Sequence, residues 1–354
     1  MPLERNSATR EPLITTLRQR ALDIVGSLVP RDRPLALLDF PRHSNVGDTA
    51  IWLGEVSCLA SCGVRQRDVR YVCDVTTYDE GTLRSAIGEE GVILLHGGGN
   101  FGDLWGEHQR FRETIVAAFP RNAIVALPQT IYYRDRTELD RTIRAFNEHE
   151  NLTLLVRDHP SLEILKGNFR ATAHLCPDLA FCLGALRRPL EPDRSIMYLA
   201  RTDKEARAKG EQLGEGTVEA CDWPAVGAAW QWRVGRSVAR FGLDHPRLQR
   251  GFREPVMFVA RRTYNAMAEE RVRAGCALLA HGRVVVTDRL HAHILSLLMG
   301  IPNVLLDNSY GKVRRFYDDW TSSSKLTHFA QTPQEALAIA RALVSQRPPD
   351  DRRA

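Results

Sequence analysis

The stretch GVILLHGGGNFGD, residues 91–103, indicates the fold class of the chain. A short apolar run ends in a glycine-rich polar turn, and a segment with helical spacing follows near 103–118. Buried strands of parallel sheets are continuous apolar runs, and glycine marks the turns that end them. The stretch is therefore typical of one strand–turn–helix unit of an α/β protein.

The same unit recurs along the chain. Further apolar runs that predict strands, each followed by a polar turn or a helical stretch, occupy 35–40, 69–75, 123–130, 152–158, 171–178, 195–202, 283–288 and 302–308. The segment LRRPLEPDR, 186–194, breaks this rhythm with two prolines and five charges, as a linker does. We therefore predict two α/β domains that face a cleft, with ligands at the carboxyl ends of the strands. The expected division is a polar start and helix at 1–34, a first domain at 35–185, the linker at 186–194, a second domain at 195–330, and a C-terminal helix and charged tail at 331–354.

Composition limits the classes of function. The 354 residues carry a net charge of only +5, with basic residues spread along the chain, so nothing indicates nucleic-acid binding. Seven cysteines without CxxC spacing predict reduced thiols in a cytoplasmic protein, with no metal site. No apolar stretch is long enough to span a membrane. The apolar residues of 12–28 have helical spacing, so this helix could pack on the first domain or make a peripheral membrane contact.

The glycine-rich turn contains a literal GxGxxG at Gly97, Gly99 and Gly102. A dinucleotide fingerprint also needs an acidic residue at the end of the next strand, and that strand ends in ALPQT, so NAD or FAD is not expected. Glycines here could let a ligand approach the backbone and could leave N–H groups free at a helix N-terminus. The alternative is close packing of strand and helix.

Other strand ends of the first domain carry polar residues. Asn45 and Asp48 precede a helix, and Asp48 either caps that helix or serves a substrate hydroxyl. Asn100, Asp103 and Gln129 follow the third and fourth strands. Further strand-end residues, which taken singly are expected to be caps or local ion pairs, are Arg157, Asp158 and Asp178.

The second domain gathers cationic residues at its strand ends. Arg201, Arg289 and Lys312 predict an anion-binding face, because arginine grips carboxylate or phosphate with two parallel hydrogen bonds. Asp288 could instead pair locally with Arg289. His291 lies two residues after Arg289, and His293 should point to another helix face and be buried.

Three motifs carry a resemblance to a known family: NVGDTAI at 45–51, LLHGGGNFGDLW at 94–105 and TDRLHAHILSLLMG at 287–300. With them, the chain from about residue 35 to about residue 320 resembles the polysaccharide pyruvyl transferases. The resemblance implies two Rossmann-like domains facing a cleft in a glycosyltransferase-B-like architecture. It also implies transfer of the enolpyruvyl unit of phosphoenolpyruvate to a sugar of a bacterial exopolysaccharide or cell-surface glycan, with formation of a pyruvate ketal.

The resemblance gives the strand-end residues their expected roles. Phosphoenolpyruvate is the donor substrate, the sugar acceptor could be a lipid-linked oligosaccharide, and no cofactor or metal is implied. His291 is the expected general acid, and Asp48 or Asp103 the base on the sugar hydroxyl. The expected substrate-binding residues are Arg201, Arg289, Leu290, Lys312, Asn308, Asn45, Gly97, Gly98, Gly99, Asn100 and Gln129.

Two other functions stay open on the residues. A nucleotide-sugar glycosyltransferase of the same architecture would use a carboxylate to hold the ribose, for which Asp307 is the candidate. A non-enzymatic module that docks on a glycan assembly complex would give no reason for a histidine beside Arg289. Enzyme location is expected to be cytoplasmic, or peripheral at the inner face of the membrane.

Overall fold

The structure is a computed structural model that describes residues 3, 11–203, 205, 220–224, 233–234, 237 and 246–346, the last range with side chains from residue 254 onward. The expected frayed start and charged tail fall outside these residues. The chain divides into two compact units. The first unit consists of 18–183 and 226–271, and the second unit of 1–17, 184–225 and 272–354.

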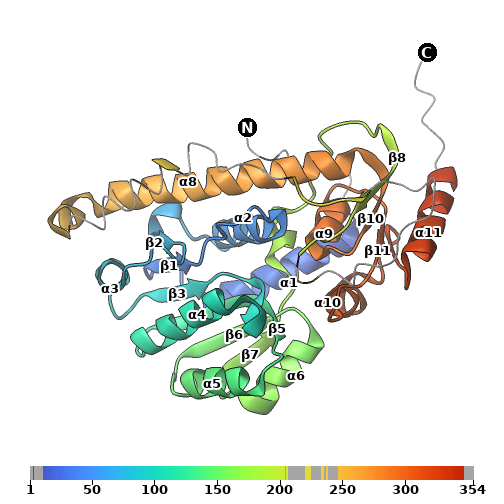
Figure 1. Ribbon diagram of the computed structural model, residues 1–354. Coiled ribbons are helices and arrows are strands. Elements are labelled where there is room, and N and C mark those ends of the chain that lie inside the picture. Colours follow the sequence, from blue (N-terminus) through green and yellow to red (C-terminus); the bar gives the residue numbers. More distant parts are fainter. Residues whose placement is uncertain are drawn as a thin grey trace. The chain divides into compact units, whose positions relative to one another are not determined.

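The first unit is built on a parallel sheet with the strand order β2-β1-β3-β5-β6-β7, and β4 pairs with β5 off this path (Figure 1). All four residues of β1 and all four of β3 are buried, as expected for strands covered on both faces. The strands are β1 (Leu35–Leu38), β2 (Val69–Cys73), β3 (Val92–Leu95), β4 (Gly98–Gly102), β5 (Ala123–Tyr132), β6 (Leu152–Val156) and β7 (Thr172–Leu175). The sequence did not predict β4, because a run of glycines has no strand propensity.

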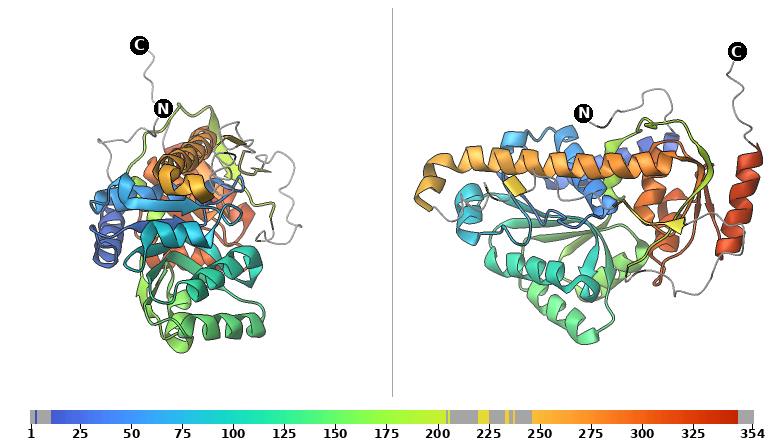
Figure 2. Two further views of the ribbon diagram at one scale, coloured as in Figure 1. Left: turned by 90° about the vertical axis from the view of Figure 1, so that its left-hand side faces the viewer. Right: turned by 45° about the horizontal axis from the view of Figure 1, so that its top comes forward.

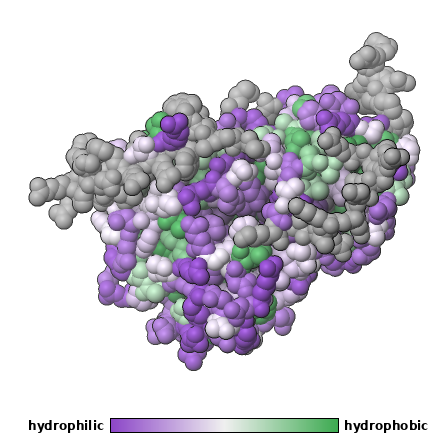
Figure 3. Space-filling model, in the orientation of Figure 1, coloured by the Kyte–Doolittle hydropathy of each residue, from purple (hydrophilic) through white to green (hydrophobic). Residues whose placement is uncertain are grey.

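Helices cover this sheet. The four helices α3 to α6 supply Leu83, Phe111, Phe146 and Leu162 to the apolar core on one face. Hydrophilic residues lie over α5 in Figure 3, as an amphipathic helix requires. The helices are α2 (Val46–Ser61), α3 (Glu80–Ile87), α4 (Gly106–Ala118), α5 (Arg136–Asn147) and α6 (His159–Asn168), with short 3-10 helices at Gln66–Asp68, Asp103–Trp105 and Leu179–Leu183.

One long helix, α8 (Pro246–Ala280), follows in the chain (Figure 2). Within the first unit its Asn265 accepts a hydrogen bond of 3.0 Å from the indole of the buried Trp52. Tyr264 stacks on Phe40 with ring centroids 4.2 Å apart. Trp230 and Trp232 lie outside the described residues.

The second unit holds a five-stranded parallel sheet with the order β12-β11-β10-β8-β9. Its strands are β8 (Arg194–Leu199), β9 (Ala220–Cys221), β10 (Gly282–Thr287), β11 (Asn303–Leu305) and β12 (Thr327–Phe329). Its helices are α9 (Leu290–Leu298), α10 (Lys312–Phe316), which continues into a π-helical turn at Tyr317–Thr321, and α11 (Pro333–Gln346). The α/β class with parallel sheets is therefore confirmed. Strands β9 and β12 were not among the predicted strands.

The N-terminal helix α1 (Pro12–Leu28) buries its apolar stripe. Ile14, Leu17, Ala21 and Val25 are at most 4% exposed. Burial of these four residues thus accounts for the helical spacing. Among the described residues, no helix combines the length and the apolar character that crossing a membrane requires.

Candidate functional site

Polar residues follow the three central strands of the second unit where each strand ends. Arg201 comes two residues after β8, Arg289 two residues after β10 and Asn308 three residues after β11. Because these strands are parallel neighbours, their carboxyl ends lie at one edge of the sheet. The side chains of Arg201 and Arg289 are 6% and 7% exposed. Two guanidinium groups are therefore held almost out of water at this edge.

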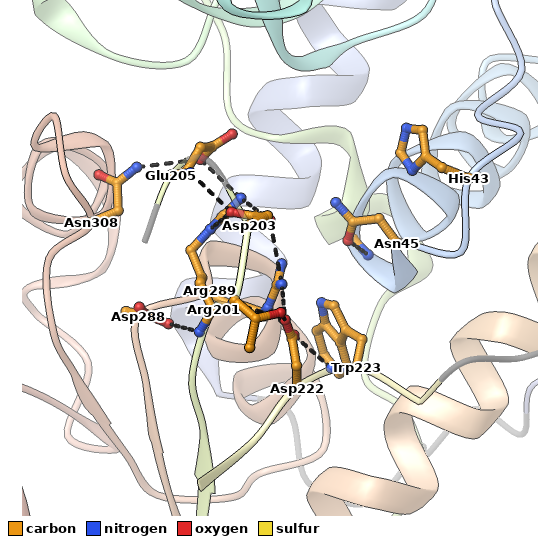
Figure 4. A network of polar contacts seen from close by, with 12 residues as sticks. His43, Asn45, Arg201, Asp203, Glu205, Asp222, Trp223, Asp288, Arg289 and Asn308 are labelled. Atoms are coloured by element: carbon orange, nitrogen blue, oxygen red, sulfur yellow. Dashed lines mark hydrogen bonds and ion pairs between the residues drawn. The ribbon is translucent and has the colours of Figure 1, made fainter. Parts of the chain in front are cut away.

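These arginines belong to a network of ion pairs (Figure 4). Arg201 donates two parallel hydrogen bonds of 2.9 Å to Asp203, and its Nη2 lies 3.1 Å from Glu205. Arg289 has its Nε and its Nη2 each 2.6 Å from an oxygen of Asp222, and its Nη2 lies 3.4 Å from Asp203. We call these five residues, together with Lys312, the cationic cluster.

Lys312 completes the cluster through Glu205. Its Nζ lies 2.6 Å from the Glu205 carboxylate, which also accepts a 3.3 Å hydrogen bond from the amide of Asn308. Burial of Glu205 opposes its ionisation, but Lys312 and Arg201 outweigh burial and lower the pKa of Glu205 to about 2. The Glu205 carboxylate is therefore ionised near neutral pH and links Lys312 to Arg201.

The cluster differs from the open anion-binding face that the sequence predicted. Its three cations face three carboxylates, and the arginine partners of Asp203 and Asp222 outweigh burial, so the pKa of each is lowered as well. The acids lie in a stretch to which sequence analysis assigned no site. Asp203 and Glu205, two and four residues after Arg201, could have been noticed, whereas Asp222 carries no local signal.

Asp288 does not form the local pair with Arg289 that the sequence left open. Its carboxylate accepts a 2.9 Å hydrogen bond from the backbone N–H of Arg201, and burial raises the pKa of Asp288 to about 6. Arg289 is the N-cap residue of α9 and turns to Asp222 and Asp203. A cation is unfavourable at a helix N-terminus, and these carboxylates compensate it.

The two histidines of α9 have different surroundings. His293 is fully buried and has ring nitrogens 2.8 Å from Asn303 and 3.0 Å from Thr321. Burial lowers the pKa of His293 to about 4, so this ring is neutral and structural, as expected. His291 is 8% exposed and lies in the first turn of α9, next to the cluster in sequence. Leu290 is 2% exposed, so its side chain is part of the core.

In the first unit, the start of α2 corrects one sequence interpretation. The N-cap is Asn45, whose side chain accepts from the N–H of Gly47, so Asp48 is not the cap. The Asn45 amide donates to Asp48 at 2.9 Å, and His43 Nε2 lies 3.5 Å from the same carboxylate. Asp48 is therefore a half-buried acid that a capping residue and a histidine hold in place.

The glycine-rich turn is a strand and not a bare helix N-terminus. Strand β4 pairs with β5, and the N–H of Gly97 donates to Glu55 at 2.8 Å. A Cβ on Gly102 would lie 1.8 Å from the carbonyl oxygen of Tyr132, and one on Gly97 would lie 2.9 Å from that of Pro128. Close packing thus explains why these two positions are glycine. The prediction of free N–H groups is wrong for Gly97, whose N–H is paired with Glu55.

Gly98 is the member of this run that borders a candidate site residue. Its φ is 124°, and a Cβ there would lie 3.5 Å from a carboxylate oxygen of Asp48. Gly99 and Asn100 are half-buried. Asn100 is held by the buried Arg112, which donates to both its carbonyl oxygen and its side chain.

Two other predicted residues are occupied by structural contacts. Asp103 accepts the backbone N–H groups of Arg134 and Asp135 at 2.6 and 2.7 Å, so it anchors the turn before α5. Gln129 is fully buried, not at the rim, and donates to the carbonyl oxygen of His96. Asp103 is thus a structural anchor, and the base role expected of Asp48 stays a prediction.

The structure adds a buried pair that sequence reasoning missed. His96 Nδ1 lies 3.0 Å from both carboxylate oxygens of Glu55, and the two side chains are 2% and 0% exposed. Burial opposes protonation of His96, but Glu55 outweighs it and raises the pKa of His96. His96 directly follows β3 and precedes the glycine run, whereas Glu55 carries no sequence signal because it lies in the middle of α2.

The remaining strand-end residues have structural roles. Arg157 and Asp178 form a buried ion pair, and Asp158 caps α6 through the N–H of Ser161. In the part of the chain that the structure describes, no three His, Cys, Asp or Glu side chains are grouped to hold a metal ion.

The two parallel sheets define a mixed α/β protein. A crystal structure of a functionally uncharacterised protein from Klebsiella pneumoniae shares this fold, with a TM-score of 0.60 at 18% identity over 89% of this chain and 99% of that chain. The sequence profile of the polysaccharide pyruvyl transferases matches residues 45–310. The chain belongs to the polysaccharide pyruvyl transferase family.

Individual relatives agree with this assignment. Pyruvyl transferase 1 of Schizosaccharomyces pombe is 32% identical over 327 residues, which cover 89% of this chain and 77% of the relative. EpsO of Bacillus subtilis, which carries a provisional pyruvyl transferase name, is 29% identical over 89% of this chain and 94% of its own length. The resemblance seen in the sequence motifs is therefore confirmed.

Proposed function

We propose that the protein moves the enolpyruvyl unit of phosphoenolpyruvate onto a sugar of a polysaccharide and closes it into a pyruvate ketal. The observation that carries this proposal is the cationic cluster. Phosphoenolpyruvate has a phosphate and a carboxylate, and Arg201, Arg289 and Lys312 are the groups suited to hold them.

Donor binding must displace carboxylates, because the cations of the cluster are already paired. The side chains of Asp203 and Asp222 are 30% and 20% exposed, whereas Glu205 is 4% exposed. The first two are the partners that a donor can replace. In the proposed complex, the donor's anionic groups take their places on Arg201 and Arg289, while Glu205 keeps Lys312 in position.

The chemistry fixes how many protons move. Protonation of carbon 3 makes carbon 2 electrophilic, one sugar hydroxyl adds there, the carbon–oxygen bond to phosphate breaks, and a second hydroxyl closes the ketal. The two hydroxyls lose two protons; carbon 3 keeps one and the departing phosphate takes the other. His291 at the start of α9 is the proposed acid toward carbon 3 or the phosphate.

The test uses the full chain with phosphoenolpyruvate and a panel of acceptors that includes free glycosides and a lipid-linked oligosaccharide. Phosphate release and product mass are followed in deuterated water. We expect one deuterium on the ketal methyl group, because carbon 3 takes its proton from an exchanged group. Phosphate release without a sugar–pyruvate product, or a methyl group free of deuterium, would overturn the proposal.

A nucleotide-sugar donor is the control in this assay. The ribose-holding carboxylate suggested from sequence, Asp307, instead accepts the backbone N–H groups of Asn308 and Arg314 at 2.9 and 3.2 Å. Transfer from a nucleotide sugar with no use of phosphoenolpyruvate would replace the proposed function by glycosyl transfer.

A further inference from the structure

Asp39 has the least common backbone conformation among the residues that the structure describes. Its φ is 73°, and it is the one non-glycine residue there with a positive φ. This conformation costs an L-residue about 1–2 kcal/mol, and asparagine and aspartate tolerate it best. Asp39 directly follows β1 at the carboxyl end of the strand, where parallel sheets bind ligands. Its side chain is 3% exposed.

The Asp39 carboxylate orients one histidine. Nδ1 of His108, in the first turn of α4, lies 2.8 and 2.9 Å from its two oxygens. Because a carboxylate accepts hydrogen bonds, Nδ1 carries the hydrogen, and in the neutral form of the ring Nε2 has the lone pair. Nε2 has no hydrogen-bond partner among the described residues.

The exposure of the ring distinguishes the His108–Asp39 pair from the buried His96–Glu55 pair. The His108 side chain is 16% exposed, whereas His96 beside Glu55 is 2% exposed. A hydroxyl arriving from solvent can therefore reach His108 in the structure as it stands. A buried, oriented carboxylate behind a partly exposed imidazole is the arrangement that makes histidine a general base.

The surroundings of His108 suit a sugar. The ring centroids of His43 and His108 are 6.3 Å apart, and the rings are nearly perpendicular. Nε2 of His43 lies 3.5 Å from the carboxylate of Asp48. The loop that carries His43 is held by Arg271, which donates to the carbonyl oxygens of Pro41 and Arg42 at 3.0 and 3.1 Å. Two imidazoles and two carboxylates thus offer acceptors and donors for neutral hydroxyl groups.

We propose that His108 is the catalytic base that deprotonates the acceptor hydroxyl, and that Asp39 is its positioning residue. This inference rests on the proposed function. The hydroxyl O–H bond breaks, its proton goes to His108 Nε2, and the oxygen lone pair forms the bond to carbon 2 of the donor. Asp39 stabilises the resulting imidazolium. His108 then releases this proton to solvent, returns to the neutral ring and takes the proton of the second hydroxyl in the same way. The protons that carbon 3 and the phosphate gain come through His291 and from solvent, so the two protons lost and the two gained balance.

The test compares His108→Gln and Asp39→Asn with a matched control. Asparagine keeps the left-handed backbone at position 39 and removes the negative charge. The control is His281→Gln, since His281 forms the same kind of pair with Asp193, at 2.9 Å, on the surface of the second unit. Each variant is assayed for kcat, for the KM of phosphoenolpyruvate and for thermal melting.

We expect kcat to fall about 10²–10⁴-fold in His108→Gln and about 10-fold or more in Asp39→Asn, with the donor KM within about threefold of the wild type. In Asp39→Asn the acid limb of the plot of kcat/KM against pH should also move, because the charge beside His108 is removed. A packing role alone would not move it. Asp39 pairs with the ring and His43 packs against it. Around these groups, Asp48 and Arg271 interact with His43, Arg112 interacts with Asp39, and Arg42 pairs with Glu107, the residue before His108. His281→Gln should leave all three quantities unchanged.

The outcomes separate the two proposals. Phosphate release by the wild type, with near-normal kcat in both His108→Gln and Asp39→Asn, would overturn the role of His108 and leave the proposed function standing. No phosphate release by the wild type with any acceptor would overturn both. If His108→Gln does not fold, the kcat and pH profile of Asp39→Asn decide the question, because that substitution preserves the backbone.

Discussion

The two units hold their strand-end charges in different ways. In the second unit every cation of the cluster already faces a carboxylate of the same unit, as Arg289 faces Asp222 at 2.6 Å. In the first unit, His108 is tied to Asp39 through one nitrogen only. The comparison teaches that the cationic cluster of the second unit must give up contacts to bind an anion. The His108–Asp39 pair of the first unit can receive a neutral hydroxyl without rearrangement.

The largest expected effect distinguishes the two histidines of α9. His291→Ala should lower kcat about 10²–10⁴-fold, because a general acid is removed, while donor binding through the arginines persists. His293→Ala should instead lower the free energy of unfolding by about 2–4 kcal/mol, since it loses two buried hydrogen bonds and leaves a cavity. Steady-state kinetics and urea unfolding measure the two effects. Near-normal kcat in His291→Ala would mean that His291 is not the general acid, and that the second unit serves donor binding alone.

The next effect tests whether the cluster binds the donor. Arg289→Ala should weaken phosphoenolpyruvate binding by about 2–3 kcal/mol, roughly 30- to 150-fold, because a charge-assisted contact is lost. Calorimetry measures this, with Arg341→Ala, on the exposed face of α11, as the control. Equal donor affinity in the two variants would mean that the cluster serves folding alone.

Asp288 gives a pH dependence whose sign follows from burial. Its folded-state pKa of about 6 is above the value of 3.8 expected in the unfolded chain. Its contribution to stability is therefore full below about pH 4 and is lost as the pH rises through 6. Asp288→Asn keeps an oxygen acceptor for the N–H of Arg201 and removes the buried charge. The variant should gain stability over the wild type by about 2 kcal/mol more at about pH 8 than at about pH 4. Urea titrations at the two pH values check this, and a difference that does not change with pH would contradict it.

A smaller effect concerns the glycine-rich strand of the first unit. Gly98→Ala should lower stability by about 1–2 kcal/mol, because its φ of 124° strains any side chain. It should also lower activity, because the new methyl group faces Asp48. Gly88→Ala, with a φ of 62° and nothing within 4 Å, carries backbone strain without that neighbour. Activity lost equally in both variants would show that strain alone is responsible.

Sequence patterns predicted the sheets better than the sites. Runs such as 92–95 are apolar throughout because helices cover both faces of the sheet, so the strands were visible without structural information. Strand ends also located Arg201, Arg289 and Asp48, because position along a parallel strand fixes the edge. The side-chain partners were not predictable. His108 lies 69 residues from Asp39 and Asp222 lies 67 residues from Arg289, and no local spacing encodes such contacts.

The contact between the rings of Trp52 and His96 has a spectroscopic consequence. This indole is 1% exposed, and its ring centroid lies 6.0 Å from that of His96, whose pKa is raised by Glu55 despite burial. A protonated imidazole quenches tryptophan emission, so Trp52 should be dim and blue-shifted while His96 holds its proton. The emission lost in Trp52→Phe reports the signal of this one indole. That signal should brighten as the pH rises through the titration of His96, which gives an optical readout beside the glycine-rich strand.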